Sequence, residues 1–68
     1  MKAELMVHNA NQIAQYFASF PHEEAVAGVA DHIQKFWEPR MRKQLHEYLG
    51  QGGSGLHELV FEAAKALH

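Results

Sequence analysis

The sequence has 68 residues, 47% of them hydrophobic, and it contains no cysteine. That length allows one domain at most, so we expect residues 1–68 to form a single domain, and the lack of cysteine excludes disulfides, thiolate metal sites and thiol catalysis. The formal net charge of -2 argues against a general affinity for nucleic acid, and no apolar run reaches the roughly 20 residues that span a membrane, so we expect a cytoplasmic protein.

The first expected helix covers residues 3–19, where apolar residues recur at steps of three and four. Its expected inward face consists of Leu5, Met6, Asn9, Ile13, Tyr16, Phe17 and Phe20. Asn9 interrupts this apolar stripe, and an asparagine there usually lies at the edge of a core or bonds a neighbouring carbonyl. Pro21 then stops the helix, because proline disfavours helical geometry in the residue before it.

The second expected helix follows at once, since Pro21 also suits a first helical turn. Its apolar stripe consists of Ala25, Val26, Val29, Ala30, Ile33, Phe36 and Trp37. Gly28 lies in the interior of this helix, where glycine costs about 1 kcal/mol relative to alanine. A close approach of another helix is the best reason for a glycine there, so we expect tight packing at Gly28.

Two breaks shape the second half of the chain. Pro39 lacks a backbone donor and predicts a helix boundary or sharp kink after Glu38, followed by a third helix over residues 39–49. Gly50 is the expected C-terminal cap of that helix. Residues 51–55 are expected to form a flexible glycine-rich loop, with Ser54 as the candidate cap of a last helix that extends to Leu67. The predicted fold is therefore all-α, a small four-helix domain.

The junction between the second and third helices carries the most distinctive residues. Residues 32–43 hold the only tryptophan and four of the six Lys/Arg residues. Large aromatic side chains beside guanidinium groups are typical of protein–protein anchors, because they bury much area with few rotatable bonds and make directional hydrogen bonds. The expected partner surface consists of Phe36, Trp37, Pro39, Arg40, Met41 and Arg42. For Phe36 and Trp37, packing in the core is an equally good interpretation.

The sequence lacks the patterns of an enzyme or a metal site. None of the six histidines has another at i+3 or i+4, and no His-Glu-x-x-His motif occurs. There is no Ser/His/Asp order and no Gly-x4-Gly-Lys phosphate loop, since no Lys-Ser/Thr follows the glycine run of residues 50–55. We therefore expect no catalytic residue, no metal and no cofactor in this chain.

Three segments together resemble a known family. They are Asn9-Ala-Asn-Gln-Ile13, Ala30-Asp-His-Ile-Gln-Lys-Phe-Trp-Glu-Pro-Arg-Met-Arg42, and Gly52-Gly-Ser-Gly-Leu56 followed by Leu59-Val60. On these segments the chain resembles the delta subunit of cytoplasmic NAD-dependent formate dehydrogenases, the multisubunit enzymes that contain molybdenum or tungsten. One departure is Glu58, where the resemblance leads us to expect proline, and it affects only how the last helix begins.

The resemblance implies a non-catalytic accessory subunit that binds the alpha subunit and supports assembly, cofactor loading or stability of the complex. In such enzymes the alpha subunit carries bis-molybdopterin guanine dinucleotide and iron–sulfur clusters. The beta and gamma subunits pass electrons to NAD through FMN and further clusters. The resemblance leaves open whether the metal is molybdenum or tungsten, and whether the delta subunit stays in the mature complex.

The alternative hypothesis is a small helical regulatory protein that contacts nucleic acid through the basic helix 39–49. A salt titration with a nonspecific duplex separates the two hypotheses, since only the regulator requires steeply salt-dependent binding. Under the leading hypothesis the partner is the formate dehydrogenase alpha subunit, with no nucleic acid and no membrane. Self-association of the isolated chain stays open.

Overall fold

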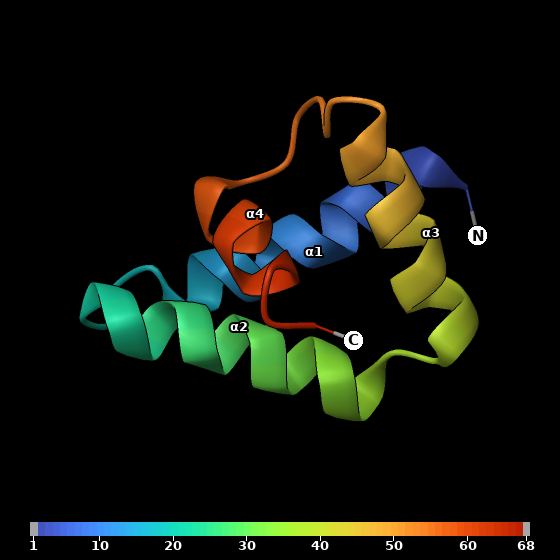
Figure 1. Cartoon of the computed structure of the whole chain (residues 1–68). Helices are drawn as coiled ribbons and strands as arrows, with labels where there is room; N and C mark the ends of the chain where they lie inside the picture. Colours follow the sequence, from blue (N-terminus) through green and yellow to red (C-terminus); the bar gives the residue numbers. More distant parts are fainter. Residues whose placement is uncertain (1, 68) are drawn as a thin grey trace.

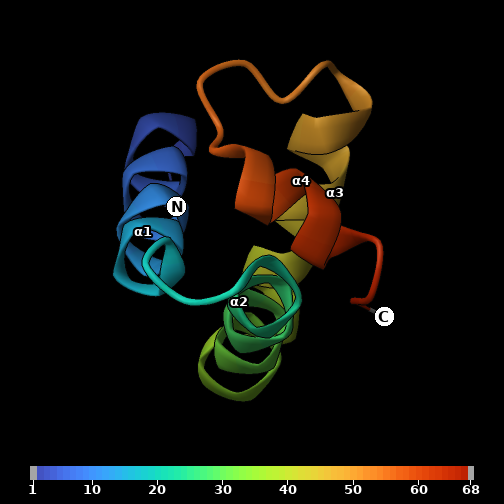
Figure 2. The same cartoon turned by 90° about the vertical axis from the view of Figure 1, so that its left-hand side faces the viewer.

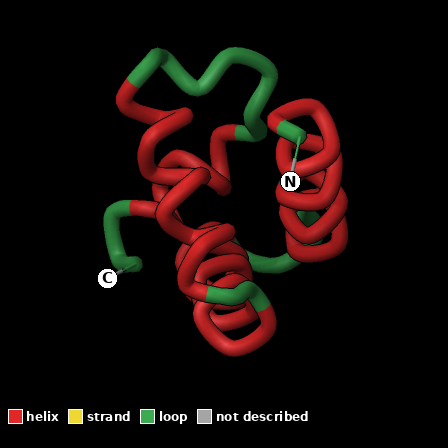
Figure 3. The backbone as a smooth tube through the Cα atoms, turned by 90° about the vertical axis from the view of Figure 1, so that its right-hand side faces the viewer, coloured by secondary structure: helices red, strands yellow, loops and turns green. Residues whose placement is uncertain are grey.

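The computed structural model describes residues 2–67. Over this range the chain forms four helices and no strand: α1 (Ala3–Phe17), α2 (His22–Phe36), α3 (Pro39–Gly50) and α4 (Glu58–Ala64) (Figure 1). α1 and α2 run in opposite directions, and α3 and α4 both lie on one side of this pair (Figures 2 and 3). The expected all-α architecture is confirmed.

The turn between α1 and α2 differs slightly from the prediction. α1 ends at Phe17 and not at Ser19. The reason is a tight turn in which the Phe20 N–H donates to the Phe17 carbonyl at 3.0 Å, a spacing of three residues that departs from the α-helical ladder. Pro21 precedes α2 as its N-cap residue, one position before the first turn in which we expected it. Its carbonyl accepts the Ala25 N–H at 2.8 Å and so begins the helix.

A short extended link joins α2 to α3. Trp37 and Glu38 have ψ angles of 138° and 153°, so the helical path is interrupted between Phe36 and Pro39. Pro39 is the first residue of α3, where an N–H would have no intrahelical partner. The Glu38 carbonyl accepts the Met41 N–H at 2.9 Å, which closes the first turn of the new helix.

α3 ends at a glycine pair rather than at the predicted cap. Gly50 is the last residue of α3, and the left-handed position falls on Gly52, whose φ is 114°. The Gly52 N–H donates to the Leu49 carbonyl at 3.0 Å, and the Gly53 N–H donates to the Tyr48 carbonyl at 3.0 Å. This pair of bonds is the Schellman pattern, which satisfies the last carbonyls of a helix. The assignment of Gly50 was wrong because a glycine run offers several positions for the cap.

α4 is a short helix capped by a histidine. It begins at Glu58, so the prediction that Ser54 caps it was wrong. The Nδ1 atom of His57 accepts the Leu59 N–H at 3.0 Å and serves as the cap instead. The first helical position tolerates proline, and the glutamate found there leaves the start of the helix intact. α4 also ends before Leu67, which the prediction had included.

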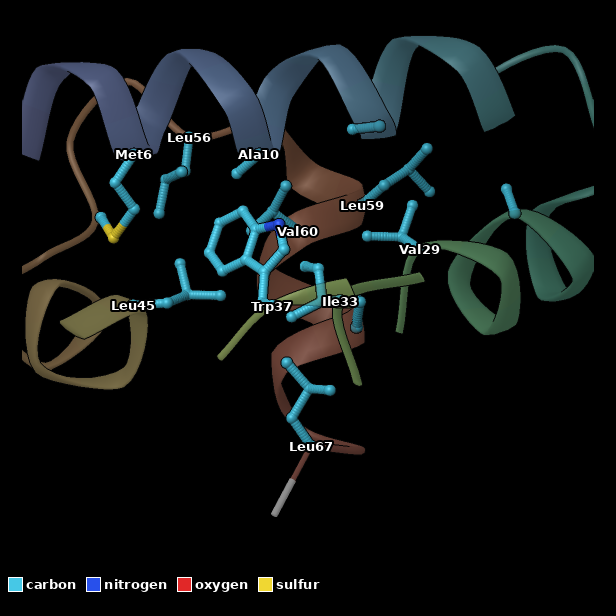
Figure 4. Packing of buried hydrophobic residues seen from close by; sticks show 13 residues of the cluster. Met6, Ala10, Val29, Ile33, Trp37, Leu45, Leu56, Leu59, Val60 and Leu67 are labelled. Carbon is cyan, nitrogen blue, oxygen red and sulfur yellow. The ribbon is translucent and has the colours of Figure 1, made fainter. Parts of the chain in front are cut away.

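One hydrophobic core joins the helices (Figure 4). Its buried residues are Met6, Ala10, Ala14, Ala25, Val29, Ile33, Trp37, Leu45, Leu56, Leu59, Val60, Ala63 and Leu67. The predicted inward face of α1 was partly wrong, because Leu5, Tyr16 and Phe20 are 51%, 70% and 42% exposed. The small side chains of Ala10 and Ala14 let α1 lie close to the core, so the larger side chains beside them remain at the surface.

Gly28 provides a close contact between α1 and α2. A Cβ atom at this position would lie 2.5 Å from Cε1 and 2.6 Å from Cδ1 of Phe17. Cβ atoms in proteins essentially never come so close to another heavy atom, so the glycine makes room for the phenyl ring. The expected tight packing at Gly28 is confirmed, and the neighbour is the Phe17 ring of α1.

Replacing Gly28 with alanine is expected to lower the free energy of unfolding by on the order of 1 kcal/mol. Alanine gains about 1 kcal/mol of helix propensity, but overpacking against the Phe17 ring costs about 1–3 kcal/mol. Urea denaturation followed by circular dichroism measures the net effect. The exposed neighbour supplies the control, because Ala27→Gly should lose only the propensity term. A stabilised Gly28→Ala variant would contradict the close contact.

Candidate partner-binding surface

The two aromatic residues at the end of α2 have different environments. Trp37 is only 7% exposed, and its indole lies among Ile33, Leu45 and Val60 (Figure 4). Phe36 is 72% exposed, and its ring lies against His32, with ring centroids 4.6 Å apart. The extended backbone of Trp37 ends the helix and directs the indole into the core. Trp37 is therefore a core residue, and Phe36 is a surface residue.

Arg42 is bound within the fold. Its Nη1 atom donates to the Trp37 carbonyl at 2.6 Å and to the Gln34 carbonyl at 3.3 Å. These carbonyls belong to the C-terminal end of α2, where backbone acceptors lack helical partners and a positive charge is favourable. Arg42 therefore fixes the start of α3 against the end of α2.

The remaining predicted interface residues lie on α3. Pro39 and Arg40 are exposed, while Met41 is half-buried and packs against the core. Of the six predicted residues, Phe36, Pro39 and Arg40 thus present their side chains to solvent. A shallow depression of about 310 Å³ lies beside them on α3, lined by Pro39, Arg42, Lys43, His46 and Glu47. Because it includes a glutamate, this face of α3 is of mixed charge.

A larger groove lies between α1 and α2. Its lining residues are Gln12, Ile13, Tyr16, Phe17, His32 and Phe36, and its volume is about 470 Å³. We call it the α1–α2 groove. The Tyr16 and Phe17 rings meet edge to face, with centroids 4.9 Å apart. Sequence reasoning missed this groove because it assigned Ile13, Tyr16 and Phe17 to the core. The signal was the four-residue spacing of small residues at Ala10 and Ala14, which marks a different face of α1 as the buried one.

Asn11 joins the first and last parts of the chain. Its Nδ2 atom donates to the Gly55 carbonyl at 2.8 Å, and its Oδ1 atom accepts the His57 N–H at 2.9 Å. The Tyr48 hydroxyl ties the same loop to α3 by donating to the Ser54 carbonyl at 2.6 Å. Asn11 and Gly55 come from two of the segments that carry the family resemblance, so part of that resemblance reflects the folding of the chain.

The described residues offer no centre for metal chemistry. Within residues 2–67, no three His, Asp or Glu side chains are grouped so that they could hold a metal ion. None of the helices in this range has the length and hydrophobicity of a membrane-spanning segment. What the surface does present is exposed aromatic area, at Tyr16, Phe20, Phe36 and Phe61.

Comparison with known proteins agrees with the sequence resemblance. The family model described as NADH-dependent formate dehydrogenase delta subunit, FdsD, matches residues 5–64. Searches of the curated proteins and of the solved structures gave no match. The matched range includes all three segments on which the resemblance was based, together with the α1–α2 groove and the α2–α3 junction. The chain therefore belongs to the NADH-dependent formate dehydrogenase delta subunit family.

Proposed function

We propose that this chain is a non-catalytic accessory subunit of a cytoplasmic NAD-dependent formate dehydrogenase. In this role it binds the alpha subunit and supports assembly, cofactor loading or stability of the complex. The observation that carries the proposal is the family match over residues 5–64, which makes the chain a formate dehydrogenase subunit with protein partners. Under this proposal the molybdopterin guanine dinucleotide, iron–sulfur clusters, FMN and NAD are bound by the other subunits.

The α2–α3 junction supports this proposal because some of its residues are exposed to a partner and others hold them in place. Phe36, Pro39 and Arg40 are exposed and available to a partner. An exposed aromatic ring beside a guanidinium group combines apolar area with directional donors, as interface anchors do. The other three residues support this surface from inside the fold. Trp37 lies in the core, Met41 packs against it, and Arg42 fixes α3 to the end of α2. We propose Phe36, Pro39 and Arg40 as the contact residues of the partner surface, with Trp37, Met41 and Arg42 as the residues that hold them in position.

The nucleic-acid alternative has weaker support. Arg42 is engaged with backbone carbonyls, and Lys35 forms an ion pair with Asp31 at 3.3 Å. Arg40 and Lys43 are the other two cations of residues 32–43, and both are exposed. Two cations neutralise few phosphates, which gives little affinity at physiological salt. The protein-partner proposal uses the exposed aromatic area as well, and we favour it for that reason.

The test compares formate dehydrogenase produced with and without this chain. We expect enzyme made without it to show less formate-dependent NAD reduction and less metal per alpha subunit. Adding the purified chain afterwards then separates two roles, because recovery of activity indicates stabilisation of the mature complex and no recovery indicates action during assembly. Equal activity, equal metal content and equal thermal stability of the two preparations would contradict the proposal.

A further inference from the structure

The α1–α2 groove exposes more aromatic surface than the fold itself requires. Tyr16 and Phe36, on its two walls, are 70% and 72% exposed. α3 and α4 lie on one side of the α1–α2 pair (Figures 2 and 3). The groove, by contrast, is open to solvent at Tyr16 and Phe36, so no helix of residues 2–67 covers these two rings. Aromatic surface of this kind marks interaction sites.

The rings of the groove are held in place before any partner binds. Phe17 sits in the space left by Gly28, and Tyr16 meets the edge of Phe17. On the opposite wall, Phe36 lies against His32. Each exposed ring is thus supported by a second ring. Binding of a partner therefore costs little entropy for ordering these rings, and such preorganisation favours affinity.

The groove carries no formal charge from acidic residues, lysine or arginine. Its six lining residues include none of these, and its polar groups are the Gln12 amide, the Tyr16 hydroxyl and the His32 ring. Asp31 and Lys35, the sequence neighbours of the α2 wall, bind each other at 3.3 Å and offset their charges. A charged segment would be desolvated here without a compensating partner, which costs free energy. The matching surface is therefore apolar and uncharged.

The shape of the groove indicates a polypeptide occupant. Pockets for small ligands bury most of the ligand surface, whereas Tyr16 and Phe36 on the walls of this groove remain largely exposed. Two helices lying side by side present a trough into which the apolar face of a third helix fits. Phe36 belongs both to this groove and to the proposed partner surface at the α2–α3 junction, so the two surfaces are continuous.

We propose that the α1–α2 groove receives an apolar, uncharged helical segment of the formate dehydrogenase alpha subunit. This assignment rests on the proposed function and adds the site and the chemistry of the contact. Tyr16 and Phe36 are the anchors, and Phe17 on Gly28 forms the floor. Binding through this groove depends on burial of apolar area and not on ion pairs.

The experiment measures capture of the alpha subunit by tagged variants of the full chain. Tyr16→Ala with Phe36→Ala should weaken capture by on the order of 10- to 100-fold in Kd, as expected for the loss of two anchors. Leu5→Ala is the control, because Leu5 is an exposed apolar residue of α1 outside the groove and its loss should leave capture unchanged. The loss of capture caused by the double substitution should also be similar at low and high salt, because both removed side chains are uncharged.

Folding and self-association are checked on the same samples. Both substituted side chains are exposed and alanine is a better helix former, so circular dichroism should show the helical content retained; the two single variants serve if the double variant unfolds. Capture equal to that of the unsubstituted chain would overturn the groove assignment and leave the proposed function standing. Dimers of the isolated chain that the double variant abolishes, with capture unchanged, would assign the groove to a second copy. Failure of the unsubstituted chain to capture the alpha subunit would reject the proposed function and the groove together.

Discussion

Replacing Trp37 with alanine is expected to destabilise the fold by about 3–5 kcal/mol, whereas the same change at the adjacent Phe36 should alter stability by no more than about 0.5 kcal/mol. The indole of Trp37 is 7% exposed in the middle of the core, and its removal leaves a large cavity. The Phe36 ring is 72% exposed, so its removal leaves none. The structure thus predicts a large loss of stability at one aromatic residue and almost none at its neighbour.

Urea denaturation of both variants, followed by helical circular dichroism, measures this difference. Tryptophan fluorescence cannot serve, because Trp37 is the only tryptophan. Domains of this size have little stability to lose, so Trp37→Ala should be largely unfolded without a partner. Trp37→Phe, which fills part of the cavity, should lose less. Similar losses for Trp37→Ala and Phe36→Ala would mean that the two rings are not divided between core and surface as the structure has them.

The same pair separates a folding role from a binding role. Loss of partner capture by Trp37→Ala has a simple explanation in unfolding, and it says nothing about an interface. Phe36→Ala keeps the fold, so a loss of capture there reports a contact. For the segment from Phe36 to Arg42, the informative substitutions are therefore those at the exposed positions Phe36 and Arg40.

The helical architecture could be predicted from the sequence because it depends on local signals. Three- and four-residue periodicity identified the four helices, and the glycine in α2 correctly indicated a close contact. The inward face of α1 was predicted less well. Periodicity counts apolar residues without weighing their size, and the close approach through Ala10 and Ala14 left Leu5 and Tyr16 outside. The α1–α2 groove was missed for the same reason.

The polar contacts could not be predicted, because they join residues that are far apart in the sequence. Asn11 bonds residues 44 and 46 positions later, and nothing near Asn11 indicates such partners. Arg42 was predicted to be an interface residue because a guanidinium group near large aromatic side chains is typical of interfaces. Its bond to the Trp37 carbonyl depends on how the link between α2 and α3 turns, which a sequence pattern does not specify.

Asn11→Ala is expected to lower the free energy of unfolding by on the order of 1–3 kcal/mol. The amide both donates to the Gly55 carbonyl and accepts the His57 N–H, so its loss leaves a donor and an acceptor without their partner. The His57 backbone immediately precedes α4, and its amide is the donor most directly affected. Hydrogen exchange at the His57 amide should therefore accelerate together with the drop in urea midpoint.

Two further substitutions make the Asn11 result specific. Asn11→Asp keeps an acceptor for the His57 N–H but places a carboxylate against the Gly55 carbonyl, so it should retain slow exchange at His57 while still losing stability. Gln15→Ala removes an exposed amide from the same helix and should change stability by no more than about 0.5 kcal/mol. If Asn11→Ala were as mild as Gln15→Ala, the connection between α4 and α1 would depend on apolar packing alone. A selective increase in exchange at His57 would instead establish Asn11 as the residue that ties the glycine-rich connection to the first helix.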